Sequence, residues 1–208
     1  MKFRHSILIT ATVLLALLAA PGSLWSWGRL AHRVSAKLAE SRLTPGARAA
    51  IRELLEPDEK LADISVWADH QKEIPYTASW HFVNVPITES RYDSKSCQKK
   101  GCVVSKIEDY KRVLMNPNKS RKDKRQALKF LVHLIQDLHQ SLHIGDNGDR
   151  GGKNLQVRWF GTGTNLHRPL DSQIINRYSR NEVGFESNRQ SHRQNQGFWE
   201  WGQKMRFL

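Results

Sequence analysis

The chain has 208 residues, of which 39% are hydrophobic and 25% are charged, and these ordinary proportions exclude an intrinsically disordered protein. Its 33 lysines and arginines outnumber its 20 aspartates and glutamates, which gives a formal net charge of +13 at pH 7. Such a charge indicates a polyanionic partner, either nucleic acid or an anionic membrane surface.

The first 26 residues have the order of a secretory signal peptide. Basic residues at positions 2 and 4 precede an apolar stretch over residues 7–20, and Pro21-Gly22-Ser23 ends that stretch. The alternative is a retained membrane anchor, because residues 6–26 carry no charge and are almost long enough to span a bilayer. We expect cleavage and a secreted or periplasmic protein. The mature chain then has 31 basic and 20 acidic residues, a net charge of +11.

Apolar residues at helical spacing predict five helices after this segment. The predicted helices cover residues 29–43, 45–55, 107–115, 122–142 and 165–178. Thr44-Pro45 and Ser120 provide caps where the second and fourth helices begin. Residues 80–85 and 155–160 are rich in β-branched and aromatic side chains and predict two short strands.

This pattern predicts an all-α fold class, a mainly helical single domain over residues 27–184 with a small β-hairpin. Residues 185–208 are polar and irregular, and we expect an aberrant tail left by a truncation or a shifted reading frame. Cys97 and Cys102 are the two cysteines of the chain, and an even count after an export signal indicates a disulfide that closes a short loop. Two free thiols are the alternative.

The histidines and aspartates of the long predicted helix have the spacing of metal ligands. His133 and Asp137 are four residues apart, so they lie on one helical face, and His143 follows near the end of the helix. His167 and Asp171 repeat the same spacing. One such pair is common without a metal, but Asp69 and His81 bring the number of potential ligands to seven. Mixed imidazole and carboxylate ligands indicate zinc or a neighbouring transition metal.

Several ordered motifs of the chain are similar to those of a known enzyme family. They are Trp27-Gly28 with His32, Ala62-Asp63-Ile64-Ser65 with Trp67-Ala68-Asp69, Trp80-His81-Phe82-Val83-Asn84, the run from His133 to His143, Asp149-Arg150-Gly151-Gly152, and Asn165-Leu166-His167 with Asp171. In these motifs, over residues 27–180, the sequence resembles the zinc-dependent single-strand-specific nucleases of the S1/P1 family. These nucleases share a helical scaffold with zinc-dependent bacterial phospholipases C.

The resemblance implies three zinc ions with defined ligands. The first is held by Asp69, His81, His133 and Asp137. The second is held by the amino group and carbonyl of Trp27, by His32 and by the shared Asp137, and the third by His143, His167 and Asp171. The amino group of Trp27 becomes available only if the signal peptide is cleaved between Ser26 and Trp27.

The resemblance also implies a secreted endonuclease and 3′-nucleotidase that acts on single-stranded DNA and RNA and leaves 5′-phosphorylated products. Asp137 is then part of the catalytic centre, and Asp63 orients the attacking water or a histidine, or else caps nearby backbone. Phe82 stacks on a base, Asn84 binds the edge of that base, and Lys72 binds phosphate. We expect a monomer without a stable protein partner. The alternatives are a phospholipase C-like phosphodiesterase and an inactive relative that binds zinc or nucleic acid.

Overall fold

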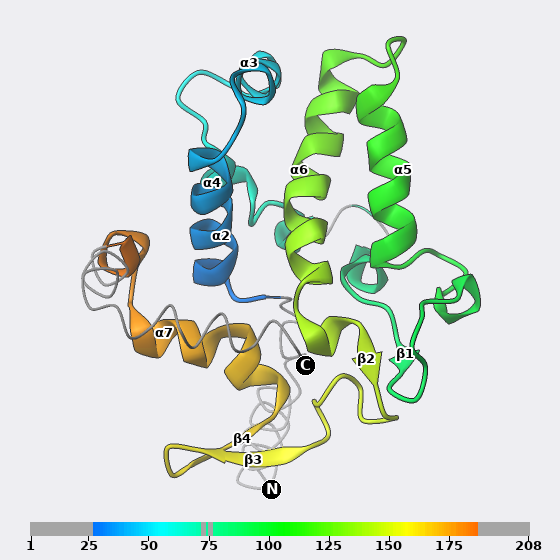
Figure 1. Cartoon of the computed structure of the whole chain (residues 1–208), viewed down its shortest axis with the longest axis vertical. Coiled ribbons are helices and arrows are strands. Elements are labelled where there is room, and N and C mark those ends of the chain that lie inside the picture. The colour runs from blue at the N-terminus through cyan, green and yellow to red at the C-terminus, as the bar shows by residue number, and fades with distance from the viewer. Residues whose placement is uncertain (1–26, 72–73, 75–76, 187–208) are drawn as a thin grey trace, which may run out of the picture.

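The computed structural model describes residues 27–71, 74 and 77–186. The predicted signal peptide, Lys72 and residues 187–208 of the predicted tail lie outside the described residues. Within the described part, no helix has both the length and the apolar character needed to cross a membrane. The architecture is mainly helical, as the sequence predicts, with two small two-stranded sheets (Figure 1).

Helix α6 (Arg121–Leu138) is the central element of the fold, with α5 along one side and α2 on the other (Figure 1). It begins where the side-chain oxygen of Ser120 accepts a hydrogen bond from the backbone N–H of Asp123 at 3.1 Å. The other α-helices are α2 (Arg29–Ser41), α3 (Pro45–Leu54), α4 (Leu61–Ile64), α5 (Val103–Met115) and α7 (Ile174–Tyr178).

Short helical turns connect these helices and carry much of the chemistry. They are η1 (Ala68–His70), η2 (Thr77–His81), η3 (Ser94–Ser96), η4 (Ser141–His143) and the π-helical turn η5 (Pro169–Gln173). All but η3 contain a predicted metal ligand. The ligands outside α2 and α6 are therefore placed mainly by tight turns rather than by long elements.

The predicted helices agree with the structure to different degrees. The first two end within two residues of their expected limits. The third begins four residues earlier than predicted, at Val103, where Ser105 accepts a hydrogen bond from the Cys102 N–H. The long helix ends at Leu138 instead of residue 142, because Gln140 has an extended backbone. The fifth segment is helical from residue 167 to residue 178, with the π-helical turn η5 leading directly into α7, while Asn165 belongs to a strand.

Two pairs of short strands hold the loops in place. Strands β1 (Val85–Pro86) and β2 (Gly145–Asp146) are parallel, and β3 (Gln156–Trp159) and β4 (Thr162–Asn165) form a small antiparallel hairpin. Strand β3 lies within the predicted strand over residues 155–160, whereas the sequence analysis did not predict β4. Phe160 and Gly161 join β3 to β4, both with positive φ (46° and 83°), as a two-residue hairpin turn of type I′ requires.

The predicted strand over residues 80–85 is wrong for most of its length. Residues 77–81 form η2, and only Val85 belongs to a strand. Trp80 and His81 both contact α6, with ring centroids 5.6 Å from Phe130 and 4.8 Å from His133. Consecutive side chains of a strand point to opposite faces, so a strand could not bring both rings to the same helix.

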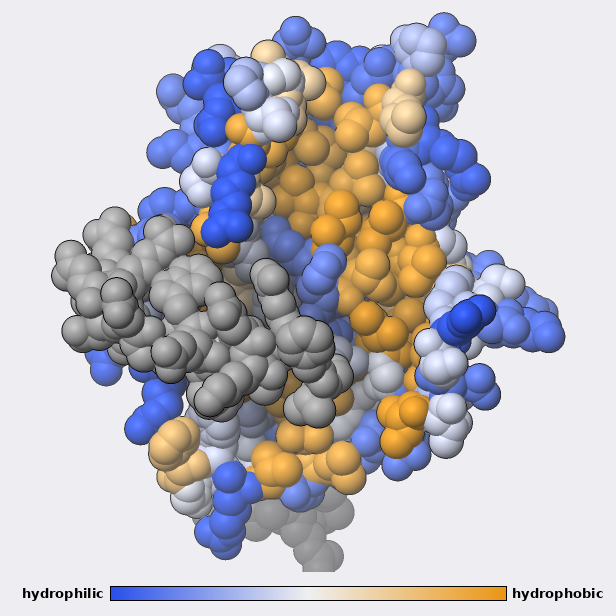
Figure 2. Space-filling model, in the orientation of Figure 1, coloured by the Kyte–Doolittle hydropathy of each residue, from blue (hydrophilic) through white to orange (hydrophobic). Residues whose placement is uncertain are grey.

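The hydrophobic core lies on two sides of α6. One cluster joins α5 and α6 to the segment before α5, and it contains Ala68, Val83, Val85, Cys102, Val103, Phe130 and Leu134. The other joins α6 to α2 and α4, and it contains Ala36, Leu55, Leu61, Ile64 and Leu128. Apolar residues also gather on the exposed face over α6 (Figure 2). The buried clusters fix α6 and the turns around it, and these carry the predicted ligands.

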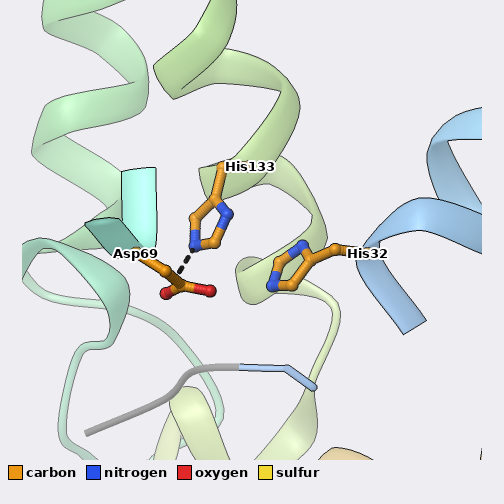
Figure 3. Close-up of side chains that lie close together, drawn as sticks. All are labelled: His32, Asp69 and His133. Carbon is orange, nitrogen blue, oxygen red and sulfur yellow. Dashed lines mark ion pairs between the residues drawn. The ribbon is translucent and has the colours of Figure 1, made fainter. Parts of the chain in front are cut away.

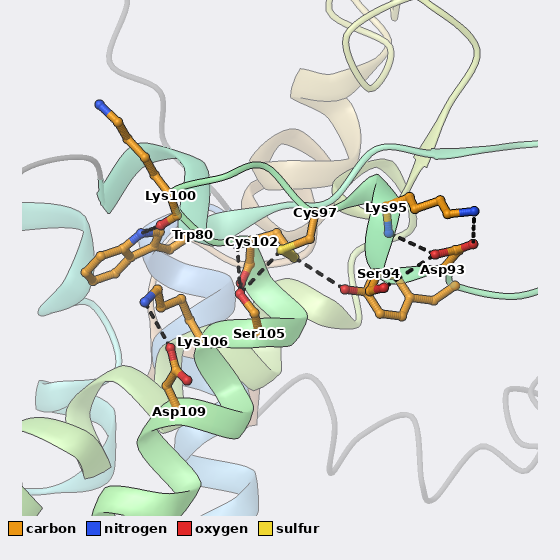
Figure 4. Close-up of a disulfide and its surroundings, with 11 residues drawn as sticks. Trp80, Asp93, Ser94, Lys95, Cys97, Lys100, Cys102, Ser105, Lys106 and Asp109 are labelled. Carbon is orange, nitrogen blue, oxygen red and sulfur yellow. Dashed lines mark hydrogen bonds and ion pairs between the residues drawn. A yellow bond between two sulfur atoms is a disulfide. The ribbon is translucent and has the colours of Figure 1, made fainter.

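The disulfide between Cys97 and Cys102 confirms the pairing predicted from the sequence (Figure 4). Its loop supports the segment that carries His81. The indole N–H of Trp80 donates to the Lys100 carbonyl at 3.0 Å, and the Val103 N–H donates to the Phe82 carbonyl at 3.2 Å. The disulfide loop therefore braces both neighbours of His81.

Replacing both cysteines, Cys97→Ala with Cys102→Ala, is expected to lower the free energy of unfolding by about 2 kcal/mol, because a short closed loop removes limited entropy from the unfolded chain. Urea denaturation of the double variant and the parent protein measures the difference. Reduction of the parent protein with dithiothreitol is the matched control and should give a similar loss. Equal stability with and without the disulfide would contradict the prediction.

Candidate metal centre

Eight predicted ligands converge around the C-terminal end of α6. They are His32 of α2, Asp69 of η1, His81 of η2, His133 and Asp137 of α6, His143 of η4, His167 after β4, and Asp171 of η5. Their donor atoms fall into three groups, and within each group the atoms lie within 4.8 Å of one another. The groups are His32 with Asp69 and His133, His81 with His133 and Asp137, and His143 with His167 and Asp171.

Asp137 belongs to the second group and also faces one histidine of each of the other two groups, His32 and His143. Its side chain is fully buried, and its Oδ2 lies 2.9 Å from His81 Nδ1 and 3.1 Å from His133 Nε2. The other oxygen, Oδ1, lies 3.3 Å from His32 Nε2 and 3.6 Å from His143 Nδ1. One carboxylate therefore faces four imidazoles, as a ligand shared between two ions would.

Asp69 lies on one side of the His133 ring, and His32 of α2 lies on the other side (Figure 3). Its Oδ1 lies 3.4 Å from His133 Nε2 and 3.9 Å from His81 Nδ1. Figure 3 shows Asp69 and His32 coming from different elements toward the ring of His133. The rings of His32 and His133 are stacked with centroids 4.0 Å apart. Residues distant in the sequence are thus brought to one point by the packing of α2 and η1 against α6.

Three histidines are oriented by hydrogen bonds from their outer ring nitrogens. His133 Nδ1 lies 2.6 Å from the Ser65 carbonyl, His167 Nδ1 lies 2.7 Å from the Gly151 carbonyl, and His32 Nδ1 lies 2.9 Å from Gln136 Oε1. Because each partner is a carbonyl oxygen that accepts, each Nδ1 carries the proton and donates. In the neutral ring the lone pair is then on Nε2. Metal-binding histidines commonly have such a partner.

The inner nitrogens of these rings point at carboxylate oxygens. His167 Nε2 lies 2.8 Å from Asp171 Oδ2, for example. A lone pair and an ionised carboxylate are both acceptors, so their approach requires a proton or a metal cation. Three of the inner atoms, Asp137 Oδ1, His143 Nδ1 and His167 Nε2, are buried and form no hydrogen bond with any residue that the structure describes. This donor set fits zinc, which binds neutral imidazole and carboxylate together.

The third group is built by η4, η5 and the glycine loop between them. Asp171 Oδ1 lies 3.4 Å from His143 Nε2 and accepts a hydrogen bond from Gln140 Nε2 at 2.6 Å. The rings of His143 and His167 are stacked with centroids 5.2 Å apart. All three predicted ligands of this group are buried. Gln140 therefore fixes the carboxylate, while Gly151 fixes His167.

The two buried aspartates remain ionised at neutral pH. Burial would raise the pKa of Asp137, but His133, His32 and His81 hold that pKa well below its ordinary value. Burial opposes ionisation of Asp171 as well, yet the close approach of His143 and His167 to its carboxylate lowers its pKa to about 2. Ionised carboxylates are the form that binds a metal.

Gly151→Ala is expected to lower the zinc affinity of the third group by about 10- to 100-fold, the usual effect of disturbing the partner of a ligand. A Cβ at this residue would lie 2.3 Å from the Leu142 carbonyl oxygen, at a backbone φ of +61°, and would displace the carbonyl that orients His167. Competition with a chromophoric zinc chelator measures the affinity.

Gly148→Ala is the matched control for this substitution. Gly148 also has a positive φ, +74°, but a Cβ there would meet nothing within 4 Å. It therefore carries the same kind of backbone strain without the clash. Equal zinc affinities in the two alanine variants would contradict the role of Gly151.

A cavity of about 210 Å³ opens beside the ligand groups. Phe82 and Asn84 line it together with His81, His143 and His167. His81 and Val83 are buried on either side of Phe82, which is half-buried and faces the cavity. The structure thus brings two of the three predicted substrate residues to the predicted metal centre, while Lys72 lies outside the described residues.

Trp27 and Asp63 lie in different surroundings. The indole of Trp27 meets the ring of His32 edge-on, with centroids 6.2 Å apart, so residue 27 lies beside another predicted ligand of the second ion. Asp63 is exposed; its carboxylate accepts a hydrogen bond from the Lys60 N–H at 3.1 Å and pairs with Arg33 at 3.1 Å. It belongs to none of the three groups, and its contacts match the alternative of a backbone cap.

Sequence reasoning missed the partners that orient the ligands. Ser65 and Gly151 act through backbone carbonyls, and Gln136 and Gln140 through side-chain amides. A carbonyl is present in every residue, so composition and spacing carry no signal for it. The two glutamines could have been found from the sequence. Gln136 is adjacent to Asp137, and Gln140 is three residues from both Asp137 and His143.

The sequence of the chain is similar to those of known nucleases. The sequence model of the family described as S1/P1 Nuclease matches residues 27–205. Endonuclease 3 of Arabidopsis thaliana is 34% identical over 160 residues, which are 72% of this chain and 54% of that protein. Endonuclease 2 of Arabidopsis thaliana is 32% identical over 188 residues, 84% of this chain and 64% of that protein.

A fungal protein is similar to the same degree. Nuclease S1 of Aspergillus oryzae is 32% identical over 170 residues, 76% of this chain and 58% of that protein. The chain therefore spans between half and two thirds of the length of the curated relatives it matches.

Proposed function

Because the chain belongs to the S1/P1 nuclease family, we propose that it is a zinc-dependent hydrolase that cleaves the phosphodiester bonds of single-stranded DNA and RNA and leaves 5′-phosphorylated products. The observation that carries this proposal is the convergence of eight mostly buried imidazoles and carboxylates beside a cavity lined by an aromatic ring. We expect the same site to remove phosphate from 3′-nucleotides.

The proposed metal set contains three ions. Asp69, His81, His133 and Asp137 hold the first, Trp27, His32 and Asp137 the second, and His143, His167 and Asp171 the third. Zinc bound by these residues would supply a nucleophile from water at neutral pH and would offset charge on the phosphate oxygens. The second set depends on the free amino group of Trp27, so the proposal includes removal of residues 1–26 on export.

The chain's own residues orient the substrate. Phe82 offers a half-buried ring on which an unpaired base can stack, and Asn84 lies on the same cavity wall with donor and acceptor groups for the edge of that base. The cavity is smaller than the roughly 300–1,000 Å³ of a typical ligand pocket, so it suits one base rather than a paired duplex. These features favour single strands as the substrate.

The test is cleavage of a labelled single-stranded oligonucleotide and of the matched duplex by the zinc-loaded, processed protein. We expect the single strand to be cut about 100-fold faster, because extracting a paired base costs a few kcal/mol. The products should carry 5′-phosphates when their masses are determined. A folded, zinc-loaded protein that leaves both substrates intact, or that instead releases phosphocholine from phosphatidylcholine, would overturn the proposal.

A further inference from the structure

Two cationic side chains line the cavity next to the third ligand group. They are Arg150 and Lys153, and they share the cavity wall with Phe82, Asn84 and His167. Among the residues that the structure describes, no carboxylate lines this cavity. Within the described part of the chain, neither cation forms a side-chain hydrogen bond or an ion pair. The cavity thus presents positive charge that the surrounding protein does not neutralise by direct contact.

The loop that carries these cations is held in one conformation. Asp146 Oδ1 accepts hydrogen bonds from the N–H groups of Asp149 and Gly151 at 3.1 and 3.2 Å, and Asp149 Oδ1 accepts one from the Gly152 N–H at 2.8 Å. Arg150 has a positive φ of 60°, which is unfavourable for a side chain other than glycine and recurs at functional sites. Since Gly151 also orients His167, the cations are fixed relative to the third group.

Lys153 is partly removed from water. Burial lowers the pKa of its ammonium group, and the charge of Asp171 acts in the opposite direction, so the ammonium is close enough to the third group to feel its carboxylate. A partly desolvated cation without a direct counter-ion gains more from binding an anion than an exposed one does. The anion that any nucleic-acid substrate brings to this place is a phosphate.

We propose that Lys153, together with Arg150, binds the substrate phosphate at the third ligand group. This inference rests on the proposed function, and it adds a reason why the site prefers one class of phosphodiester to another. Two cations in a cavity whose described lining contains no carboxylate favour an anionic phosphate and repel the quaternary ammonium of a choline headgroup. The pair therefore selects nucleotides over zwitterionic phospholipids.

The test compares Lys153→Met and Arg150→Met with the parent chain, all processed and zinc-loaded. Calorimetric titration with inorganic phosphate measures binding without turnover, and the KM and kcat for a single-stranded oligonucleotide are measured in parallel. We expect Lys153→Met to weaken phosphate binding and to raise KM by about 10- to 100-fold, because a charge-assisted hydrogen bond is lost. The change in kcat should be small. The slope of log KM against log salt should fall by about 0.7 for the lost contact.

Two further variants make the result specific. Lys153→Arg should restore most of the affinity, because it keeps the charge. Lys95→Met removes a lysine whose side chain is 91% exposed and should change nothing. Phosphate affinity and KM of Lys153→Met equal to those of the parent chain would overturn this inference while leaving the nuclease function standing. A parent chain that binds phosphate through Lys153 but leaves nucleic acid intact would support the inference and overturn the proposed function.

Discussion

Asp137→Asn is expected to remove two of three bound zinc ions and to lower nuclease activity by more than about 100-fold, beyond the loss typical of a mere ligand partner. The carboxylate of Asp137 faces His81 and His133 through one oxygen and His32 through the other. Asparagine has almost the same shape, but it lacks the charge and presents an N–H₂ donor where a ligand oxygen was. Zinc content by mass spectrometry, together with the initial rate on a single-stranded oligonucleotide, measures both effects.

Asp123→Asn is the control on the same helix. Asp123 lies in the first turn of α6, where it contacts Ser120, and it is exposed and remote from every ligand group. This change should weaken only the helix cap, at a cost of about 1 kcal/mol or less. If Asp137→Asn kept three zinc ions, the shared role of Asp137 would be wrong.

Asp171→Asn is expected to remove one zinc ion and leave two, again with more than about 100-fold loss of activity. Asp171 is held by Gln140 Nε2 at 2.6 Å and faces His167 at 2.8 Å, and it belongs to the third group alone. The N–H₂ group of an asparagine would face one of two neighbours. Toward Gln140 it would meet another donor, and toward His167 it would replace the oxygen that is the predicted zinc ligand. Native mass spectrometry of the variant distinguishes two ions from one or three.

Ser172→Ala is the matched control for the third group. Ser172 follows Asp171 in η5, and its hydroxyl donates to the Arg168 carbonyl at 3.3 Å without reaching a predicted ligand. It should retain three ions and the parent activity. A carboxylate shared by two ions should cost two ions when it is replaced, and an unshared one should cost a single ion. We therefore expect Asp137→Asn to lose two ions and Asp171→Asn to lose one. Equal stoichiometries in the two variants would contradict it.

The parts of the centre that are local in sequence were predictable from the residues. His133 with Asp137, and His167 with Asp171, are four residues apart, and each pair does face one place in the structure. The convergence of His32, Asp69 and His81 on α6 depends on packing between distant segments, and no spacing rule contains it. The resemblance to a family supplied that grouping, and the structure brings those side chains together.

The errors in secondary structure have physical causes of the same kind. The segment around Trp80 has strand composition, but the need to bring Trp80 and His81 to the same side of α6 makes it a helical turn. The start of α5 was missed because its cap comes from Ser105 and the disulfide-bonded Cys102, which show no apolar period. In both cases tertiary contacts outweigh local preference.

The most direct test of the central claim is anomalous X-ray scattering at the zinc edge from crystals of the processed protein. We predict three zinc peaks, one among Asp69, His81, His133 and Asp137, one between His32 and the amino group of Trp27, and one among His143, His167 and Asp171. A crystal grown with zinc that shows these side chains ordered and no zinc peak beside Asp137 would contradict it.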